Sequence, residues 1–262
     1  MMKAQNKKPN FLEWNNSILA SSLKKINLNV LLIVFLDALF YLMSGYAAIF
    51  WMQRIQAKMA SFSMPSNLIA LAPGAAKQLA GNVRGFYYLI IISFLLLLIA
   101  IIFLASILKG IIWAKTTGTK ISFRLISRFF AVNIPWIGFW IALAFLIAYL
   151  AEPAYTPALM AALAIAGFYF TNTLYSIFMK EQGFKSILRA VRLCISKFHI
   201  FLLPYAAILL LLYALIRLGS LLKFSYSSAL FGIALLFYAA VVRYYASALA
   251  LEAEKGLKQK SL

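Results

Sequence analysis

Six apolar segments, each about as long as a membrane is thick, constrain this 262-residue chain more than any other feature. A hydrocarbon core of about 30 Å is crossed by about 20 residues of α-helix. The six segments are residues 28–51, 86–108, 129–150, 156–178, 198–216 and 227–251. Lipid offers no partner to an unpaired backbone group, so a spanning segment must be a helix or part of a closed barrel. The segments lack the alternating pattern of barrel strands. The sequence therefore predicts an all-α, polytopic bundle of six transmembrane helices.

Composition excludes the common soluble classes. Hydrophobic residues make up 65% of the chain and charged residues 12%, which is far from the composition of a soluble enzyme or a disordered segment. The net charge of +19 would favour nucleic acid in a soluble domain. Here the basic residues lie in short stretches beside the apolar segments, where they orient the chain and meet anionic headgroups. We therefore expect membrane lipids as partners, and no nucleic acid.

The distribution of basic residues predicts the orientation. Of the 25 Lys and Arg residues, 19 fall before span one, between spans two and three, between spans four and five, or near and after the end of span six. The positive-inside rule then places both termini in the cytoplasm of a cell-membrane protein. This divides the chain into a cytoplasmic segment at 1–27, a six-span domain at 28–251 and a cytoplasmic tail at 252–262. A further interfacial helix is expected within 1–27, around Trp14, Ile18 and Leu23.

One long connection stands out on the outer side, at residues 53–85. It is moderately apolar and contains two prolines. We expect it to lie on the outer interface or to dip into the bundle. A passive interfacial helix and a lid or gate both remain open.

Two stretches 65 residues apart resemble each other. Residues 111–124 read IIWAKTTGTKISFR, and residues 176–189 read SIFMKEQGFKSILR, with five identities in fourteen positions. Each stretch ends a span, turns at a glycine (Gly118 or Gly183) and leads through a basic helix into the next span. Both copies cross in the same direction, so the sequence predicts a parallel internal repeat of span, basic amphipathic helix and span.

The basic helices are predicted at 118–129 and 183–197. In the first, Lys120, Arg124 and Arg128 are spaced to share one helical face. Such helices lie at the interface with their cations towards headgroup phosphates, although the same charges could serve orientation alone. The candidate lipid- or partner-binding residues are Lys115, Lys120, Arg124, Arg128, Lys180, Lys185, Arg189 and Arg192.

The layout, with the pattern G-x-K-x-x-x-R at 118–124 and again at 183–189, resembles poorly characterised prokaryotic six-span membrane proteins. It is similar to the membrane domain attached to some glycerophosphodiester phosphodiesterases. The aromatic-rich final span, LFGIALLFYAAVVRYYASALALE, shares this similarity. The 262 residues hold no soluble phosphodiesterase domain, so the resemblance implies a fold and carries over no catalytic residues.

Asp37 lies about ten residues into span one, near the middle of the membrane. A carboxylate there costs about 2.5–3.5 kcal/mol, so it should face the bundle and have a partner. It is either a proton or cation site or a structural lock between helices. The polar residues that could partner it are Ser44, Ser106, Asn133, Thr171, Asn172 and Thr173. Arg243 is expected to extend to the cytoplasmic surface. Pairing with an acid also remains open, and Glu152, Glu252 and Asp37 are equally plausible partners.

The chain shows no metal-ligand cluster, phosphate loop or nucleophile motif, and its six acids and single histidine leave few groups for acid–base chemistry. We expect no enzyme activity, no cofactor and no metal. The favoured hypothesis is a non-enzymatic membrane component that engages anionic lipid or a cytoplasmic partner through the two basic helices. The alternative is a transporter or permease subunit with a midplane site at Asp37 and a separate ATPase as partner.

Overall fold

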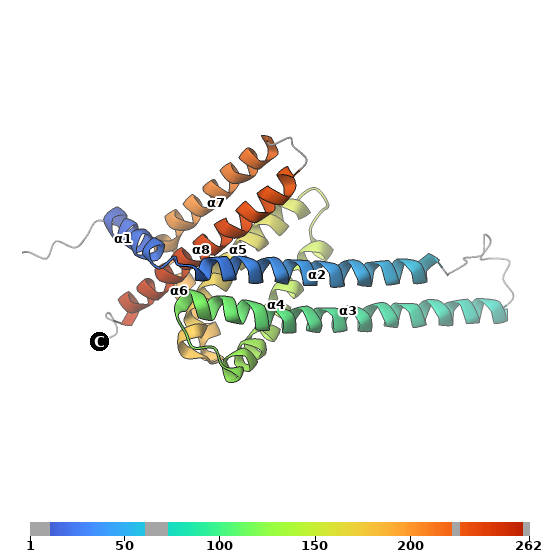
Figure 1. Ribbon diagram of the computed structural model, residues 1–262. Coiled ribbons are helices and arrows are strands. Elements are labelled where there is room, and N and C mark those ends of the chain that lie inside the picture. Colours follow the sequence, from blue (N-terminus) through green and yellow to red (C-terminus); the bar gives the residue numbers. More distant parts are fainter. Residues whose placement is uncertain (1–10, 61–72, 222–225, 259–262) are drawn as a thin grey trace, which may run out of the picture. The chain divides into compact units, whose positions relative to one another are not determined.

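A computed structural model describes residues 11–60, 73–221 and 226–258 of the chain. The regular elements of this part are helices throughout (Figure 1). They are α1 (Phe11–Lys24), α2 (Asn29–Ala60), α3 (Pro73–Thr117), α4 (Phe123–Leu150), α5 (Thr156–Glu181), α6 (Lys185–Ser196), α7 (Phe198–Leu221) and α8 (Ser227–Lys258).

Six of these helices are long and apolar enough to cross a membrane, namely α2, α3, α4, α5, α7 and α8. Each coincides with one predicted span, so the chain is a multi-pass membrane protein of the all-α class. The surfaces of these helices are largely apolar and exposed, because lipid tails replace the protein core as their surroundings. The two remaining helices, α1 and α6, are short.

The chain divides into two compact units. The larger unit contains residues 1–38 and 106–262, and therefore the first third of α2, the last quarter of α3 and all the other helices. The smaller unit contains residues 39–105. Within it, α2 and α3 contact each other where the Trp51 indole Nε1 donates to Ser93 Oγ at 3.0 Å.

The core of the larger unit gathers around the second half of α5. Residues 172–179 of α5 are all buried, and α5 contacts α4, α6 and α8. The rings of Phe129 and Tyr175 lie 4.7 Å apart, and Trp113 meets Tyr175 edge to face at 5.6 Å. Helix α1 joins this core through Ile18 and packs on α8, where Tyr245 donates to Asn15 Oδ1 at 2.5 Å.

The connection between α3 and α4 corrects one prediction. Helix α3 ends where Gly118 adopts a left-handed φ of 71° and the Thr119 amide bonds the Ala114 carbonyl at 2.8 Å, the hydrogen bond of a Schellman motif. Helix α4 begins after Ser122, whose side chain accepts from the Leu125 amide at 3.1 Å. The separate basic helix predicted at 118–129 is therefore wrong. Lys120 lies in the connection, whereas Arg124 and Arg128 belong to the first turns of α4.

The second predicted basic helix agrees with α6, which occupies Lys185–Ser196 within the predicted range 183–197. Its preceding turn differs in one detail. The residue with left-handed backbone is Gln182, with φ of 52°, and not the glycine that follows it. The two similar stretches thus end their helices with different turns. They do bury matching residues, because Ile112 and Ile177 are both fully buried in the structure.

Helical structure also extends into the predicted outer connection at 53–85. Helix α2 continues to Ala60, and α3 begins at Pro73. The residues between them, 61–72, lie outside the described part of the chain. The connection is shorter than the sequence predicts. The end of α2 and the start of α3 contain the cations Arg54, Lys58, Lys77 and Arg84, which make these segments less apolar without opposing helix formation.

Candidate functional site

Asp37 is the centre of a buried ion cluster within the larger unit. Its side chain on α2 is 1% exposed. The Lys109 ammonium from α3 donates to Asp37 Oδ1 at 2.5 Å, and the Arg243 guanidinium from α8 donates to Oδ2 at 2.9 Å through Nη2. Both oxygens of the carboxylate therefore face a cation. We call these three residues the buried triad.

The physical reason for this arrangement is the cost of charge in lipid. An uncompensated ion in the membrane is costly, and opposite charges on neighbouring helices remove much of that cost. Arg243 also lies over the ring of Trp113, with 5.8 Å between the guanidinium carbon and the ring centroid. The expectation that Arg243 extends to the surface is wrong, since only 9% of it is exposed. Within the described residues, its Nη1 is buried without a hydrogen-bond partner.

The polar residues named as partners of Asp37 bond elsewhere. Asn133 on α4 donates to Ser106 Oγ at 3.2 Å and accepts from the Tyr175 hydroxyl at 2.7 Å. Thr171 on α5 accepts from the Trp136 indole at 2.9 Å. These bonds join α3, α4 and α5 to one another, and Asp37 finds its partners on α3 and α8 instead.

A second ion cluster lies nearer the end of the chain, and sequence reasoning missed its acid. Glu254 on α8 is 3% exposed at its side chain. Lys180 of α5 lies 3.1 Å from its Oε2, and Arg189 of α6 lies 3.6 Å from its Oε1. Arg189 also pairs with Glu181. A signal existed in the sequence: Glu254 follows Ala250 by four residues and so continues a buried helical face.

Three of the eight predicted lipid- or partner-binding cations thus contact the protein itself. Lys180 and Arg189 bind acids, and Arg128 donates to the Gln182 carbonyl at 3.2 Å, where the cation meets the negative end of α5. The other five are exposed and form no ion pair with a described residue. They are Lys115, Lys120, Arg124, Lys185 and Arg192.

Helix α6 presents three faces. The first packs on the protein through buried Ser186, Ala190, Leu193 and Cys194. The second is apolar but exposed, with Leu188 77% and Ile195 68% exposed. The third is the basic face of Lys185, Arg189 and Arg192. These residues recur every three or four positions, so they share one side of the helix, and this side lies between the other two faces. Helical spacing in the sequence places the basic face opposite an apolar face that contains Leu188 and Ile195. The structure adds the packing face.

The single cysteine, Cys194, belongs to the packing face. It is 1% exposed, and burial raises the pKa of its thiol to about 11. The thiol therefore stays neutral at physiological pH, which makes it an inert packing residue rather than a nucleophile.

Within the described residues, no three His, Cys, Asp or Glu side chains are grouped so that they could hold a metal ion. Four acids instead lie in ion pairs with Lys or Arg, namely Asp37 on α2, Glu181 on α5, and Glu252 and Glu254 on α8. The arrangement offers paired charges inside the bundle and unpaired cations on its surface.

Comparison with family models, with curated proteins and with solved structures found no match to this chain. The resemblance drawn from the layout of spans and basic segments therefore stays a prediction.

Proposed function

We propose that this chain is a non-enzymatic component of the cell membrane that engages anionic lipid through exposed cations. These cations lie at the end of the larger unit that holds α1, α6 and the C-terminal part of α8. We call this end the terminal face. The proposal places both termini and the terminal face in the cytoplasm, in accord with the excess of Lys and Arg there.

The observation that carries the proposal is the three-faced surface of α6. A helix packed on its own protein needs one apolar face, but α6 has a second one that is exposed at Leu188 and Ile195. Exposed apolar residues beside a row of cations are the features of a helix in the membrane interface. Lipid tails would cover the apolar face, and headgroup phosphates would meet Lys185 and Arg192.

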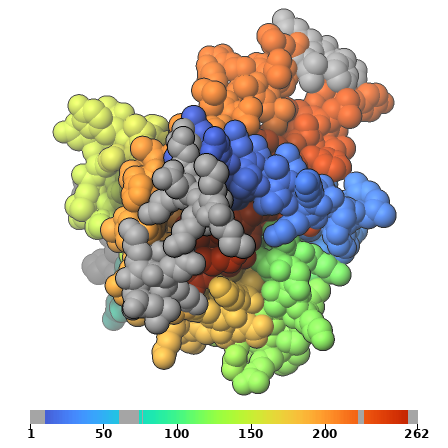
Figure 2. Space-filling view, turned by 90° about the vertical axis from the view of Figure 1, so that its left-hand side faces the viewer, coloured from blue at the N-terminus to red at the C-terminus, as the bar shows by residue number. Residues whose placement is uncertain are grey.

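The start of α4 repeats this combination. Ile121 and Phe123 are 43% and 87% exposed, and the exposed cations Lys120 and Arg124 alternate with them in the sequence. The α3–α4 connection also approaches the last turn of α5, because the Thr119 hydroxyl oxygen lies 3.4 Å from the Met179 carbonyl oxygen. Figure 2 looks towards this side, where the green atoms of the first segment adjoin the gold atoms of the second.

The alternative, a transporter or permease subunit with its site at Asp37, has less support. Both Asp37 oxygens already face cations, so a transported cation would have to displace Lys109 or Arg243. The buried triad fits a structural lock between α2, α3 and α8 better than an open midplane site.

The test measures lipid binding to the full chain in mild detergent by native mass spectrometry. Phosphatidylglycerol and phosphatidylcholine are titrated in parallel, first with wild type and then with Lys185→Gln/Arg192→Gln. We expect wild type to prefer the anionic lipid. Each cation near an anionic surface contributes about 1 kcal/mol, so the double variant should bind phosphatidylglycerol up to roughly 30-fold more weakly.

The matched control is Arg54→Gln/Lys77→Gln, which removes the same charge from residues of the smaller unit. Its preference for phosphatidylglycerol should equal that of wild type. Equal loss in both variants would mean a general charge effect and would contradict the proposal. A co-purifying ATPase without any lipid preference would favour the transport alternative.

A further inference from the structure

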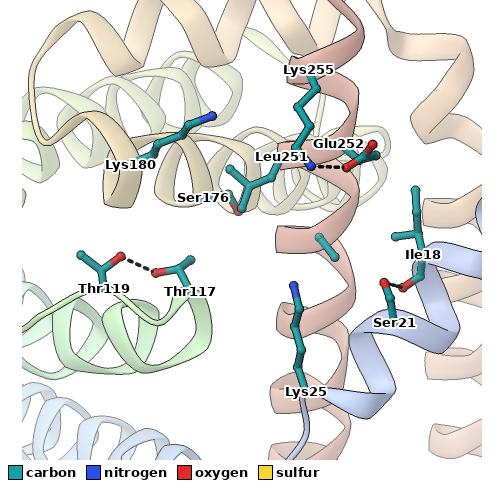
Figure 3. A pocket seen from close by; sticks show the side chains of 11 residues that line it. Ile18, Ser21, Lys25, Thr117, Thr119, Ser176, Lys180, Leu251, Glu252 and Lys255 are labelled. Atoms are coloured by element: carbon teal, nitrogen blue, oxygen red, sulfur yellow. Dashed lines mark hydrogen bonds and ion pairs between the residues drawn. The ribbon is translucent and has the colours of Figure 1, made fainter.

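A pocket of about 380 Å³ opens on the terminal face, entirely within the larger unit. It lies between α1, the end of α3, the end of α5 and the last turns of α8. Figure 3 shows side chains entering it from all four elements. This volume falls within the range of small-molecule sites. The proposed function does not use the pocket.

Three lysines from three different segments line the pocket. Lys25 follows α1, Lys180 belongs to α5 and Lys255 to α8. Lys180 binds Glu254 at 3.1 Å, and Lys255 binds Glu252 at 2.8 Å. Among the described residues, Lys25 forms no ion pair. Among the described residues of the lining, Glu252 is the one acid against three lysines, so the pocket is positive and suits an anion.

Four described residues of the lining carry hydroxyl groups whose hydrogens are already used. Ser176 is fully buried, so the hydroxyls open to a ligand are those of Ser21, Thr117 and Thr119. Ser21 donates to the Ile18 carbonyl at 2.9 Å, and Ser176 donates to the Asn172 carbonyl at 2.7 Å. Thr117 donates to the Trp113 carbonyl at 2.8 Å, which leaves Thr119 as the donor in its 2.9 Å bond with Thr117.

Each hydroxyl has one hydrogen and two lone pairs. With its hydrogen bonded to the protein, it offers a ligand an acceptor. The pocket therefore combines ammonium donors for an anion with oxygen acceptors for donor groups. A bare inorganic anion would use only the first of these, whereas an anion that also carries hydroxyl groups would use both.

We propose that this pocket binds a phosphate ester that also carries hydroxyl groups. Lys25, with support from Lys180 and Lys255, holds the phosphate, and the Ser and Thr oxygens with Glu252 accept from the ligand hydroxyls. The ligand is either a lipid headgroup such as phosphoglycerol or a soluble polyol phosphate. The lipid source rests on the proposed function, because it requires the terminal face to lie at the headgroup level.

Access to the pocket supports this assignment. Lys25 and Lys255 are exposed, so a ligand reaches their ammonium groups without opening the bundle. Leu251 gives the pocket an apolar side, against which the carbon skeleton of a polyol can pack. The buried triad lies deeper along the same helices, since Lys109 precedes Thr117 on α3 by eight residues and Arg243 precedes Ala248 on α8 by five.

The experiment binds defined probes to the full chain. The soluble arm measures glycerol 3-phosphate and, as an anion without hydroxyl groups, sulfate in detergent by isothermal calorimetry. The lipid arm measures phosphatidylglycerol by native mass spectrometry. The variant is Lys25→Gln, because Lys25 makes no ion pair whose loss would disturb the fold. The matched control is Lys24→Gln, which removes the same charge from the neighbouring exposed residue outside the pocket.

We expect Lys25→Gln to weaken binding about fivefold in one arm, which corresponds to one cation near a phosphate, while Lys24→Gln binds as wild type does. Loss in the lipid arm identifies a headgroup site, and loss in the soluble arm alone identifies a soluble polyol phosphate. Glycerol 3-phosphate should also bind more tightly than sulfate, and Ser21→Ala should reduce that difference.

Two results would overturn the inference: equal binding by Lys25→Gln and wild type in both arms, or equal affinity for the two soluble probes. Either result leaves the proposed function intact if Lys185→Gln/Arg192→Gln still loses its preference for phosphatidylglycerol. Conversely, loss of glycerol 3-phosphate binding in Lys25→Gln, with no lipid preference in wild type, would retain the pocket and reject the lipid proposal.

Discussion

The residue whose surroundings most clearly decide its role is Asp37. A lone carboxylate inside a membrane is read first as a functional group. Here two cations from other helices face its two oxygens, so the favourable interactions of the carboxylate are within the protein. The two cations that stabilise the Asp37 carboxylate in the membrane also occupy both of its oxygens. Asp37 is therefore poorly suited to bind a transported ion.

We predict that Asp37→Asn destabilises the protein. The substitution keeps the shape of the side chain but removes the carboxylate that faces the partly buried Lys109 and the buried Arg243. Breaking a buried pair in this way costs about 3–5 kcal/mol. The measurement is the midpoint of thermal unfolding in detergent, which should fall clearly below that of wild type.

The control is the triple variant Asp37→Asn/Lys109→Met/Arg243→Met. Replacement of a whole buried ion cluster by residues of similar volume is often neutral or stabilising, so the triple variant should recover most of the lost stability. A single variant that unfolds at the wild-type temperature would instead show that Asp37 does not lock the helices.

At the scale of elements, short local signals determine where the helices end. Gly118 ends α3 because its φ of 71° is accessible to glycine at little cost. Ser122 then starts α4 by accepting from the Leu125 amide. Together these two residues interrupt what would otherwise be a continuous basic helix, and they place Lys120 in an exposed connection.

We predict that Gly118→Ala lowers the free energy of unfolding by about 1–2 kcal/mol, because a Cβ atom strains the left-handed conformation. The matched control is Gly138→Ala in the middle of α4, where an added Cβ would meet nothing within 4 Å. That control should leave stability unchanged or raise it by up to about 1 kcal/mol. Unfolding by increasing sodium dodecyl sulfate, followed by circular dichroism, measures both. Equal effects would contradict the role assigned to Gly118.

At the scale of the whole molecule, the distribution of charge makes a prediction about topology. With both termini in the cytoplasm, Lys120 lies inside and Lys77 outside. In intact cells, a membrane-impermeant maleimide should therefore label Lys77→Cys and should label Lys120→Cys only after permeabilisation. The reverse pattern would invert the topology and place the terminal face on the outer side.

The native Cys194 provides the control for this labelling. Its thiol is buried and its pKa is raised from about 9 to about 11. Burial disfavours the thiolate, so the neutral Cys194 thiol contributes to the stability of the folded state below about pH 9. This contribution is lost as the pH rises through about 11. Wild type should thus show no labelling at neutral pH in the folded state and one labelled site after denaturation.

Much of this architecture was accessible to sequence reasoning. Helix is the structure that satisfies backbone groups in lipid, so six apolar segments of sufficient length predict six spans directly, and the structure contains them. Helical spacing likewise located α6 and its cations. The packing face of α6 was not predicted, because the burial of Leu193 depends on how the helix packs against the bundle, whereas Leu188 on the apolar face stays exposed.

The pairing of charges was decided by tertiary structure alone. Asp37 and Arg243 are 206 positions apart, and no local pattern relates them. Glu252 and Glu254 look alike in the sequence, but Glu254 is buried against Lys180 whereas Glu252 is half-exposed. Sequence by itself determined that this chain forms membrane-spanning helices, because burial in lipid is a property of each segment. Which acid meets which cation, and where a pocket remains between helices, depends on how the segments pack, since electrostatic and steric contacts are properties of pairs.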